Sequence, residues 1–385
     1  MNEYFSYPDK IRIDRAVFYK IAPIPLDVPF KDGTGNVRNA SLFGSWMKIY
    51  DEDGVCGQGP CTPLMLNFFV PMLLKEEAKT VDGWREYFYW QIRNFGYQSA
   101  HVSEMGSLDM ILLDLLANRA GKPLHRFLGA DRDWCRVYKG GGSVLLSDEE
   151  LIEDLVRFKS EGYHQTKFKI GYGTDWGKDI RRLEKARIAL GEEFGIAVDA
   201  NQAWDVETAF AFSKEAAAYH VSWIEEPVHA YDMAGLKQLR DKLDEAGIAM
   251  SVAMGESVRS YHTFAGYAEH GVDHLQPGNT RMYCIGENMK VWELAKEKGA
   301  MLSSGGFTFQ NVVMGTLYGE EAMIEYHQPI MEVLVPYFSV VSEVKDGKFY
   351  LPDVPGLPVQ MDFEKLERDG LLEEIIIRNR KKNEK

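Results

Sequence analysis

From about residue 133 the chain alternates short apolar runs with longer stretches of mixed polarity. This alternation predicts β-strands joined by helices in a parallel α/β structure. Two of the helices are expected at Ser147–Ser160, with Ser147 as the N-cap, and at Thr208–Tyr219. Strands are predicted at Cys135–Lys139, Gln165–Ile170, Ile196–Asp199, Val221–Ile224, Ala249–Met254, His274–Gln276, Met301–Ser303 and Met323–Glu325. Eight parallel strands close into a barrel, so the expected fold class is α/β with a TIM-like barrel.

The part of the chain before the barrel follows other patterns. Alternating positions predict strands at residues 11–21 and 42–51, and Glu52–Gly54 predicts a turn into a further short strand at 55–58. Pro23–Val37 contains Pro, Gly and Asp with little periodicity, which predicts a long loop. The candidate functional side chains in and near this loop are Lys31, Asp32, Arg38 and Trp46.

Helices are expected next. Residues 67–96 are rich in aromatics and are predicted to be helical, and apolar positions at helical spacing predict a second helix over 107–120. Asp109 and Asp114 are expected to be cap or interface residues of that helix. After Val341 the pattern predicts a strand, a Pro-rich turn and a solvated charged tail over 373–385.

Charged residues gather at the ends of successive predicted strands. Lys167 and Lys169 are two apart on one strand, so both ammonium groups point to the same face. Asp199, Glu225 and Glu256 each end a later apolar run and are separated by 26 and then 31 residues, about one strand, one helix and their loops. Strand-end carboxylates converge on the C-terminal rim of a parallel barrel. An oxygen-preferring dication would relieve their repulsion, and Mg²⁺ fits best because it accepts carboxylates and keeps positions open for a substrate.

Each of these signals has an ordinary explanation when taken alone. A Lys-x-Lys pair is usually a solvated strand edge, and an acidic residue after a strand is often a helix N-cap. All four signals in this order and at these intervals are hard to obtain by chance, and the combination favours a metal site.

The same segments carry a resemblance. The sequence resembles the enolase superfamily, and in particular its mandelate racemase and muconate lactonizing branch. The matching motifs are Lys167–Lys169, Val198–Asn201, Trp223–Pro227, Gly255–Ser257, Ser107–Leu115, Gly121–Leu124 and Leu128–Gly129. The resemblance implies a (β/α)7β barrel with an α+β capping domain. It also implies a division into a capping domain at 1–130, a barrel at 131–340, and a segment at 341–385 that returns to the capping domain.

The resemblance also implies roles for individual residues. Lys169 would be the general base, and Lys167 would contact the substrate carboxylate. Two neighbouring ammonium groups lower each other's pKa, toward the ~7 to 8 that suits a base at neutral pH. Glu325 matches the carboxyl group that binds the substrate carboxylate in the family, and Asn201 could also reach substrate. Glu226 is expected to orient a lysine or to cap a loop.

Further residues are candidates for binding substrate hydroxyls or a distal carboxylate. They are Lys139, Tyr138, Arg281 and Tyr283. The resemblance also implies that the Pro23–Val37 loop and a second loop near residues 57–65 close over the substrate.

Two departures from the family pattern bear on the chemistry. Mandelate racemase-like members carry an Asp after Gln-Pro on the sixth strand and a His at the end of the seventh, and muconate lactonizing relatives carry a sixth-strand Lys. Here Gly278 and Gly305 stand at these positions. With Gly306 they are expected to leave space for a larger polyol.

The absence of a second base disfavours racemisation, which needs proton delivery to the opposite face. Elimination of water from a β-hydroxy carboxylate can use one face for both steps. The favoured function is therefore Mg²⁺-dependent removal of an α-proton, with dehydration of an acid sugar to a 2-keto-3-deoxy acid. An epimerase or cycloisomerase, or a carboxylate binder without turnover, stays open as an alternative.

The net charge and composition limit which kinds of molecule this protein is expected to bind. A net charge of −14 argues against nucleic acid or an anionic membrane, while the two lysines and a metal keep a small anionic carboxylate possible. Met1–Asp9 lacks an apolar signal segment, and the four cysteines are scattered, so a cytoplasmic protein with free thiols is expected. The resemblance implies a homodimer or an octamer.

Overall fold

The computed structural model describes residues 4–33, 35, 37–41, 44–171, 175–340 and 343–381. Eight parallel strands in this part of the chain form a closed barrel, because the last strand pairs with the first from Met323↔Arg136 to His327↔Gly140. The strands are β6 Trp134–Gly141, β7 Gln165–Lys169, β8 Gly195–Asp199, β9 Val221–Glu225, β10 Ser251–Met254, β11 His274–Leu275, β12 Met301–Ser304 and β13 Met323–His327. The predicted α/β barrel is confirmed, with strand ends that differ by at most two residues.

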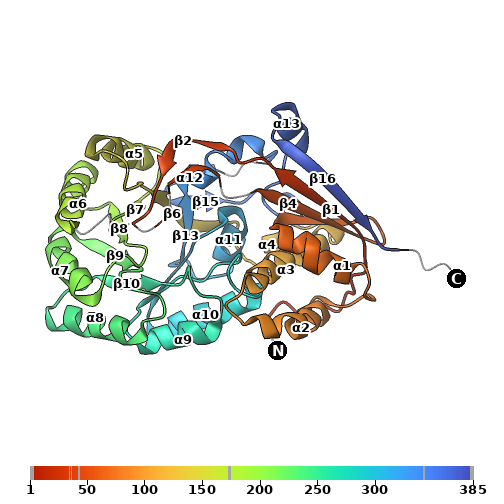
Figure 1. The fold of residues 1–385 in the computed structure, drawn as a ribbon, viewed down its shortest axis with the longest axis horizontal. Helices are drawn as coiled ribbons and strands as arrows, with labels where there is room; N and C mark the ends of the chain where they lie inside the picture. The colour runs from red at the N-terminus through yellow and green to blue at the C-terminus, as the bar shows by residue number, and fades with distance from the viewer. Residues whose placement is uncertain are drawn as a thin grey trace.

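Helices cover the outside of the barrel (Figure 1). They are α5 Asp148–Ser160, α6 Trp176–Leu190, α7 Val206–Ala216, α8 Met233–Glu245, α9 Tyr261–Glu269, α10 Ile285–Lys298, α11 Thr308–Gly315 and α12 Gln328–Met331, with 3₁₀ turns η3 Ala217–Tyr219 and η4 Val335–Tyr337. Ser147 caps α5 as predicted, in a reciprocal capping box with Glu150. The helix expected at Thr208–Tyr219 begins two residues earlier and ends in the 3₁₀ turn.

A second layer packs beside the barrel. It contains the antiparallel sheet β16-β1-β4-β5 and the helices that lie on it, seen at the right of Figure 1. Its elements are β1 Ile13–Ile21, β2 Pro25–Phe30, β3 Arg38–Ala40, β4 Ser45–Asp51, β5 Cys56–Pro60, η1 Met65–Phe69, α1 Val70–Leu73, α2 Val81–Ile92, η2 Arg93–Phe95, α3 Ala100–Arg119, α4 Leu124–Phe127, α13 Phe363–Arg368 and β16 Leu372–Asn379. The hairpin β14 Glu343–Lys345 and β15 Lys348–Tyr350 instead extends the barrel sheet at β6. The domain boundaries at 130 and 340 stay a prediction.

Three expectations for this layer are confirmed only in part. The loop expected over 23–37 contains β2, which pairs with β3. The single helical stretch at 67–96 is broken between α1 and α2, where Thr80 caps the new helix. The helix predicted at 107–120 begins earlier, at Ala100. The apolar pattern does not reveal its first turns, because the polar residue Glu104 lies on the buried face, where it accepts hydrogen bonds from Thr62. The strand expected at 42–51 is found from Ser45, and residues 42 and 43 lie outside the described residues.

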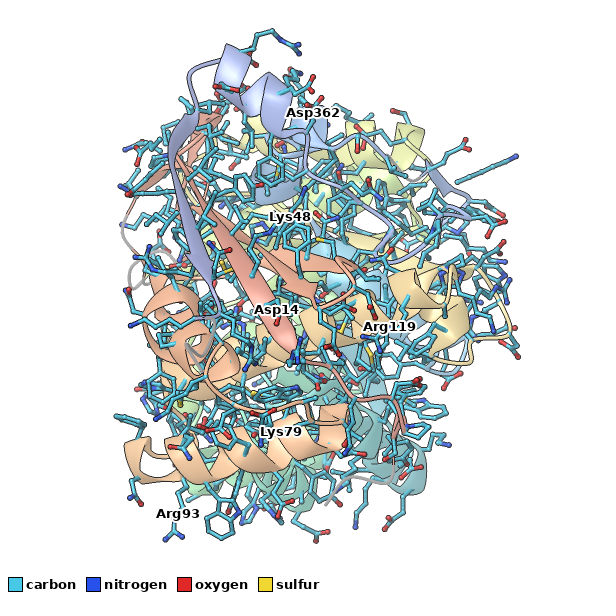
Figure 2. All side chains as sticks on the ribbon, turned by 90° about the vertical axis from the view of Figure 1, so that its right-hand side faces the viewer. Asp14, Lys48, Lys79, Arg93, Arg119 and Asp362 are labelled. Carbon is cyan, nitrogen blue, oxygen red and sulfur yellow. The ribbon has the colours of Figure 1, made fainter. Side chains whose placement is uncertain are left out.

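Most of the charged tail expected at 373–385 is instead the strand β16, Leu372–Asn379, and residues 382–385 lie outside the described residues. The strand pairs with β1 from Arg15↔Asn379 to Ile21↔Leu372, which places the red and blue ends of the chain side by side (Figure 1). Arg380 donates hydrogen bonds to the carbonyl oxygens of Ile13, Leu73 and Glu76. Figure 2 views this sheet with Asp14, which also pairs with Arg380, on its outer face.

A buried ion pair joins this layer to the barrel. Arg85 of α2 donates Nε and Nη2 to Asp109 of α3 at 2.7 and 3.2 Å, and Asp109 also accepts the backbone N–H of Ile285 at the start of α10. Asp109 is therefore an interface residue, as expected. Asp114 is one too, because it accepts N–H groups from Gln58 and Leu357.

Replacing Asp109 tests this junction. Asp109→Asn leaves the buried guanidinium of Arg85 without its charged partner, and we expect it to lower the free energy of unfolding by roughly 3 kcal/mol. Asp82→Asn is the matched control, since Asp82 pairs with the same Arg85 but its side chain is 35% exposed, and we expect a loss of about 0.5 kcal/mol. Urea unfolding of both variants measures the difference. Equal losses would contradict the assigned role of Asp109.

Candidate active site

The strand alternation decides which side chains enter the barrel. Tyr138, Ala197, Trp223 and Ala253 point inward and pack against one another, with the Tyr138 and Trp223 rings edge to face at 5.3 Å. Asp199 and Glu225 lie two residues further along β8 and β9, so they face the same interior one layer nearer the strand ends. Tyr138 is thus part of the barrel packing, and the expectation that it binds substrate hydroxyls is not supported by its position.

Two lysines and three carboxylates meet above this packing. Lys167 Nζ lies 3.0 Å from Asp199, 2.6 Å from Glu225 and 3.0 Å from Glu325. Lys169 Nζ lies 2.5 Å from the same Asp199 oxygen. All five side chains are buried. The structure therefore brings together both predicted catalytic lysines, two of the predicted metal ligands and the predicted carboxylate-binding Glu325.

The charges of this cluster set its pKa values. Burial lowers the pKa of Lys167 and Lys169, but the facing carboxylates more than offset burial, and the pKa of each lysine lies above its ordinary value. The expectation that the two ammonium groups depress each other toward 7 or 8 is therefore wrong for this arrangement, because Asp199 outweighs the neighbouring lysine. Burial alone would raise the pKa of Asp199, yet Lys167 and Lys169 hold it well below its ordinary range.

The carboxylates outnumber the ammonium groups. Three carboxylates face two lysines, and burial, with the charge of Asp199, raises the pKa of Glu225 to about 8. Burial and the charges of Glu256 and Asp199 likewise raise the pKa of Glu226 to about 8. At neutral pH both groups therefore largely keep a proton, because the two lysines do not stabilise the ionised form of every carboxyl group at this end of the barrel.

The third predicted metal ligand lies apart from the first two. Glu256 follows β10, its side chain is 38% exposed, and its carboxylate is 3.9 Å from Arg281. Arg281 also donates to the backbone oxygen of Glu256 at 2.7 Å. Within the described ranges, no three His, Cys, Asp or Glu side chains are grouped so that they could hold a metal ion. Lys167 and Lys169 take the carboxylate oxygens instead.

The donor chemistry still suits a divalent cation. The side chains at these strand ends are carboxylates, which are the ligands Mg²⁺ prefers. They share one electrostatic cluster, since Glu256 and Asp199 both act on Glu226. A bound cation would take the place of the proton that Glu225 keeps at neutral pH, so the chemistry of Asp199, Glu225 and Glu256 fits a divalent cation.

Several supporting residues were not predicted. Gln276 donates to Glu225 Oε2 at 2.7 Å and to Ser303 at 3.3 Å. Gln202 donates to Glu226 at 3.0 Å and to Ser257 at 2.8 Å. The position of Gln276 after the sixth strand could have indicated an inward side chain by the same alternation that identified the lysines. Gln202 lies in a loop where Asn201 and Gln202 have positive φ, so no periodicity indicates its direction.

The remaining predicted site residues lie in different places. Asn201 stays at the rim, where its backbone N–H donates to Asp199 at 2.9 Å. Lys139 points outward instead, with Nζ at 3.0 Å from Glu161 and 2.7 Å from Glu332. Lys139 fails as a substrate ligand because its neighbour Tyr138 takes the inward direction on β6.

The glycines at the strand ends do not leave an open space. A Cβ at Gly305 would lie 2.7 Å from Oε2 of Glu325, and one at Gly278 would lie 2.8 Å from the carbonyl oxygen of Gly305. A Cβ at Gly140 would overlap the other Glu325 oxygen. The expectation that Gly278 and Gly305 enlarge the pocket is therefore wrong. Gly140 and Gly305 make room for the Glu325 carboxylate, and Gly278 makes room for the backbone of Gly305.

The first expected covering loop does lie over the barrel. Gly33 is so close to the strand ends that a Cβ there would lie 2.7 Å from Ile170 O and 3.0 Å from Ala200 O. The backbone of Lys31 is bonded to Ser143 and Val144 after β6. The second loop is expected at residues 57–65, but residues 57–60 belong to β5 and Thr62 is bonded to Glu104 of α3. Trp46 is a core residue whose Nε1 donates to Gln58.

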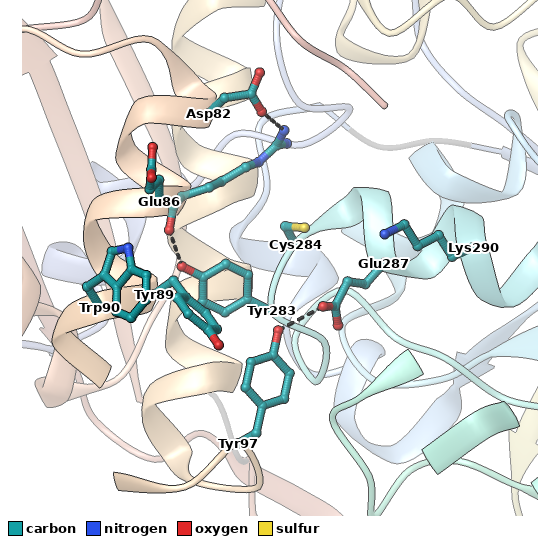
Figure 3. Close-up of a pocket in the computed structure, with 10 residues that line it drawn as sticks. Asp82, Glu86, Tyr89, Trp90, Tyr97, Tyr283, Cys284, Glu287 and Lys290 are labelled. Carbon is teal, nitrogen blue, oxygen red and sulfur yellow. Dashed lines mark hydrogen bonds and ion pairs between the residues drawn. The ribbon is translucent and has the colours of Figure 1, made fainter. Parts of the chain in front are cut away.

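A separate hollow of about 320 Å³ lies between α2 and α10 (Figure 3). Tyr97 donates to Glu287 at 2.7 Å, and Tyr283 donates to the backbone oxygen of Arg85. Tyr283 therefore stabilises this helix junction and does not reach the strand-end cluster. No helix of the described chain is both long and apolar enough to cross a membrane. The four cysteines are free, as expected.

The comparisons with known proteins agree with this arrangement. Residues 150–366 match the family model for enolase C-terminal domain-like proteins. The chain belongs to the enolase superfamily, in its mandelate racemase and muconate lactonizing enzyme-like branch. It is 31% identical over 287 residues to L-talarate/galactarate dehydratase of Salmonella typhimurium, covering 74% of this chain and 70% of that relative.

Two further similarities show the range of chemistry among relatives. A 3,6-anhydro-alpha-L-galactonate cycloisomerase of Streptomyces coelicolor is 28% identical, over 90% of this chain and 96% of its own. The crystal structure of the Salmonella typhimurium dehydratase liganded with Mg and L-lyxarohydroxamate has a TM-score of 0.83 and 26% identity, covering 96% of this chain and 94% of that one. The relatives are thus enzymes, and they include both dehydratases and isomerases.

Substitution of Gly305 tests whether this glycine makes the space in which the Glu325 carboxylate lies. In Gly305→Ala the new methyl group would displace the Glu325 carboxylate from its partner Lys167, and we expect a loss of roughly 1–3 kcal/mol in the free energy of unfolding. Gly266→Ala is the matched control, because its nearest neighbour is 3.6 Å away and Ala is the better helix former. Urea unfolding compares the two, and an undiminished stability of Gly305→Ala would show that Glu325 is not held as described.

Proposed function

We propose that this protein is a Mg²⁺-dependent hydro-lyase that dehydrates an acid sugar to a 2-keto-3-deoxy acid. The observation that carries the proposal is the buried cluster of Lys167, Lys169 and strand-end carboxylates, combined with glycines at both positions of the family's second base. The similarity to an acid-sugar dehydratase over 74% of the chain supports the same class.

Each residue of the cluster has a part in this proposal. Asp199, Glu225 and Glu256 would hold Mg²⁺, which supplies positive charge against the negative charge that develops on the substrate carboxylate when the α-proton leaves. Lys167 and Glu325 bind that carboxylate end. Lys167 holds the pKa of Glu325 below its ordinary value, so Glu325 takes up a proton only when the negative charge of the substrate carboxylate arrives beside it. Asn201 and Arg281 lie at the rim and contact the rest of the sugar.

Lys169 is the proposed base, and its present partner matters. As an ammonium bound to Asp199, it cannot accept a proton. Asp199 would hold the metal ion through the carboxylate that now faces Lys169, and sharing its negative charge with a dication would weaken the ion pair to Lys169. The proximity of Lys167 then favours the neutral amine.

A second function stays open because a cycloisomerase is similar along 90% of the chain. A cycloisomerase or epimerase of this kind would exchange or move the α-proton without releasing water. A homodimer or octamer, and the division into a capping domain at 1–130, a barrel at 131–340 and a returning segment at 341–385, are part of the proposal.

The first experiment follows the α-proton. Wild-type protein with Mg²⁺ in deuterated water is incubated with mono- and diacid sugars, and both 2-keto acid formation and α-deuterium incorporation are measured. We expect keto acid from at least one compound, and we expect Lys169→Ala to lose exchange and product by at least about 100-fold, since the base is gone. Lys185→Ala, at an exposed lysine, is the control and should keep both. Incorporation of α-deuterium without formation of keto acid would favour epimerisation over dehydration. Full α-deuterium exchange in Lys169→Ala would show that Lys169 is not the base.

Metal removal tests the ligand set without relying on turnover. After chelation and dialysis, added Mg²⁺ should raise the thermal midpoint of the wild type, because a ligand that binds the folded state stabilises it. In Glu225→Gln this rise should shrink markedly, since a charged donor is lost. Glu161→Gln alters a carboxylate on the outside of the barrel and should keep the full rise. An equal rise in all three proteins would rule out Glu225 as a ligand.

A further inference from the structure

The last barrel strand presents a histidine to the same interior as the cluster. Residues two apart on a strand share a face, so His327 points the same way as Glu325, whose carboxylate is bound to Lys167. Tyr326 between them points outward, where Lys139 Nζ lies 4.6 Å from the centre of its ring. Because His327 ends β13, its ring lies one layer nearer the barrel mouth than Glu325.

The ring of His327 is held at its side and has a spare polar atom. Phe30, at the end of β2, packs edge to face against it with the ring centres 5.4 Å apart. Its buried Nδ1 makes no hydrogen bond to any residue in the described part of the chain. A buried polar atom without a partner is costly, and at the mouth of a site it is available to a ligand.

The charges around the ring are those of the proposed active site. Burial lowers the pKa of His327 to about 4, and Glu325, Lys169, Lys167 and Glu256 all act on it. The ring therefore belongs to the same electrostatic cluster. A substrate carboxylate brings negative charge into this cluster, which favours the imidazolium form.

We propose that His327 is the acid that protonates the β-hydroxyl group as it leaves the substrate. This role rests on the proposed dehydratase function. The resemblance offers no acid for the leaving hydroxyl group on the sixth or seventh strand, because Gly278 and Gly305 stand at those positions. A side chain at Gly278 would collide with the Gly305 backbone, and one at Gly305 would collide with Glu325.

The proton balance closes without another reactant. Lys169, as the free amine, takes the α-proton, and the electron pair of that C–H bond forms the double bond to the β-carbon. The β-carbon–oxygen bond breaks, its electron pair stays on oxygen, and the oxygen takes a proton from the imidazolium of His327 and departs as water. The remaining enol gives its O–H proton to His327 while Lys169 returns a proton to the β-carbon. This yields the 2-keto-3-deoxy acid and restores both residues.

The test separates proton removal from loss of water. For an acid sugar that the wild type dehydrates, His327→Asn should lower 2-keto acid formation by at least about 100-fold. Its α-deuterium exchange should stay within about 10-fold of the wild type, because Lys169 and the metal ligands are intact. His220→Asn is the control, since His220 is an exposed histidine with positive φ, which Asn tolerates, and it should leave both rates unchanged.

A substrate analogue distinguishes an acid from a structural residue. Fluoride leaves without a proton, so on the 3-deoxy-3-fluoro analogue His327→Asn should eliminate within about 10-fold of the wild-type rate. Equal losses of water and fluoride elimination, or a variant that releases water at the wild-type rate, would overturn the role of His327 alone. A wild-type protein that neither exchanges the α-proton nor eliminates would overturn the dehydratase proposal and the role of His327 with it.

Discussion

The structure depends on how buried charges are balanced at the carboxyl ends of the barrel strands. Lys167 sits between Asp199, Glu225 and Glu325, and Lys169 shares Asp199 with it. None of these groups could be buried alone, since an unpaired charge in a protein interior is far more costly than a paired one. The balance is incomplete, because the pKa of Glu225 is raised to about 8 and this carboxyl group largely keeps a proton at neutral pH.

The same balance explains the glycines around it. Glu325 reaches Lys167 only because Gly140 and Gly305 have no side chains where its carboxylate lies. The seventh-strand position at which the resemblance leads us to expect a base is thus a glycine here, Gly305, next to which the Glu325 carboxylate lies. A larger side chain at Gly305 and the Glu325 carboxylate would need the same space, so only one of them can be present.

The layer beside the barrel takes part in the site. Phe30 rests on His327, and the Lys31 backbone is bonded to Ser143 and Val144 after the first barrel strand. The Arg85–Asp109 pair and the Ile285 N–H hold α2, α3 and α10 together, so the covering segment is attached to a fixed frame. The proposed base Lys169 on β7 and the proposed acid His327 on β13 are then held at fixed positions by two strands of the same barrel, as proton removal and proton donation on one substrate require.

The eight-strand barrel and most of its charged centre could be predicted from the amino-acid sequence. Short-range periodicity is a local property, and it places Lys167, Lys169, Asp199 and Glu225 on inward faces at strand ends without knowledge of the fold. The contacts of those side chains could not be predicted in this way. The outward turn of Lys139, the raised pKa values of the lysines, the filled space at Gly305 and the pairing of 372–379 with β1 all depend on neighbours distant in the chain. His327 shows the same limit, since its alternation was visible in the sequence, whereas the Phe30 contact and the unpartnered Nδ1 exist only after the chain has folded.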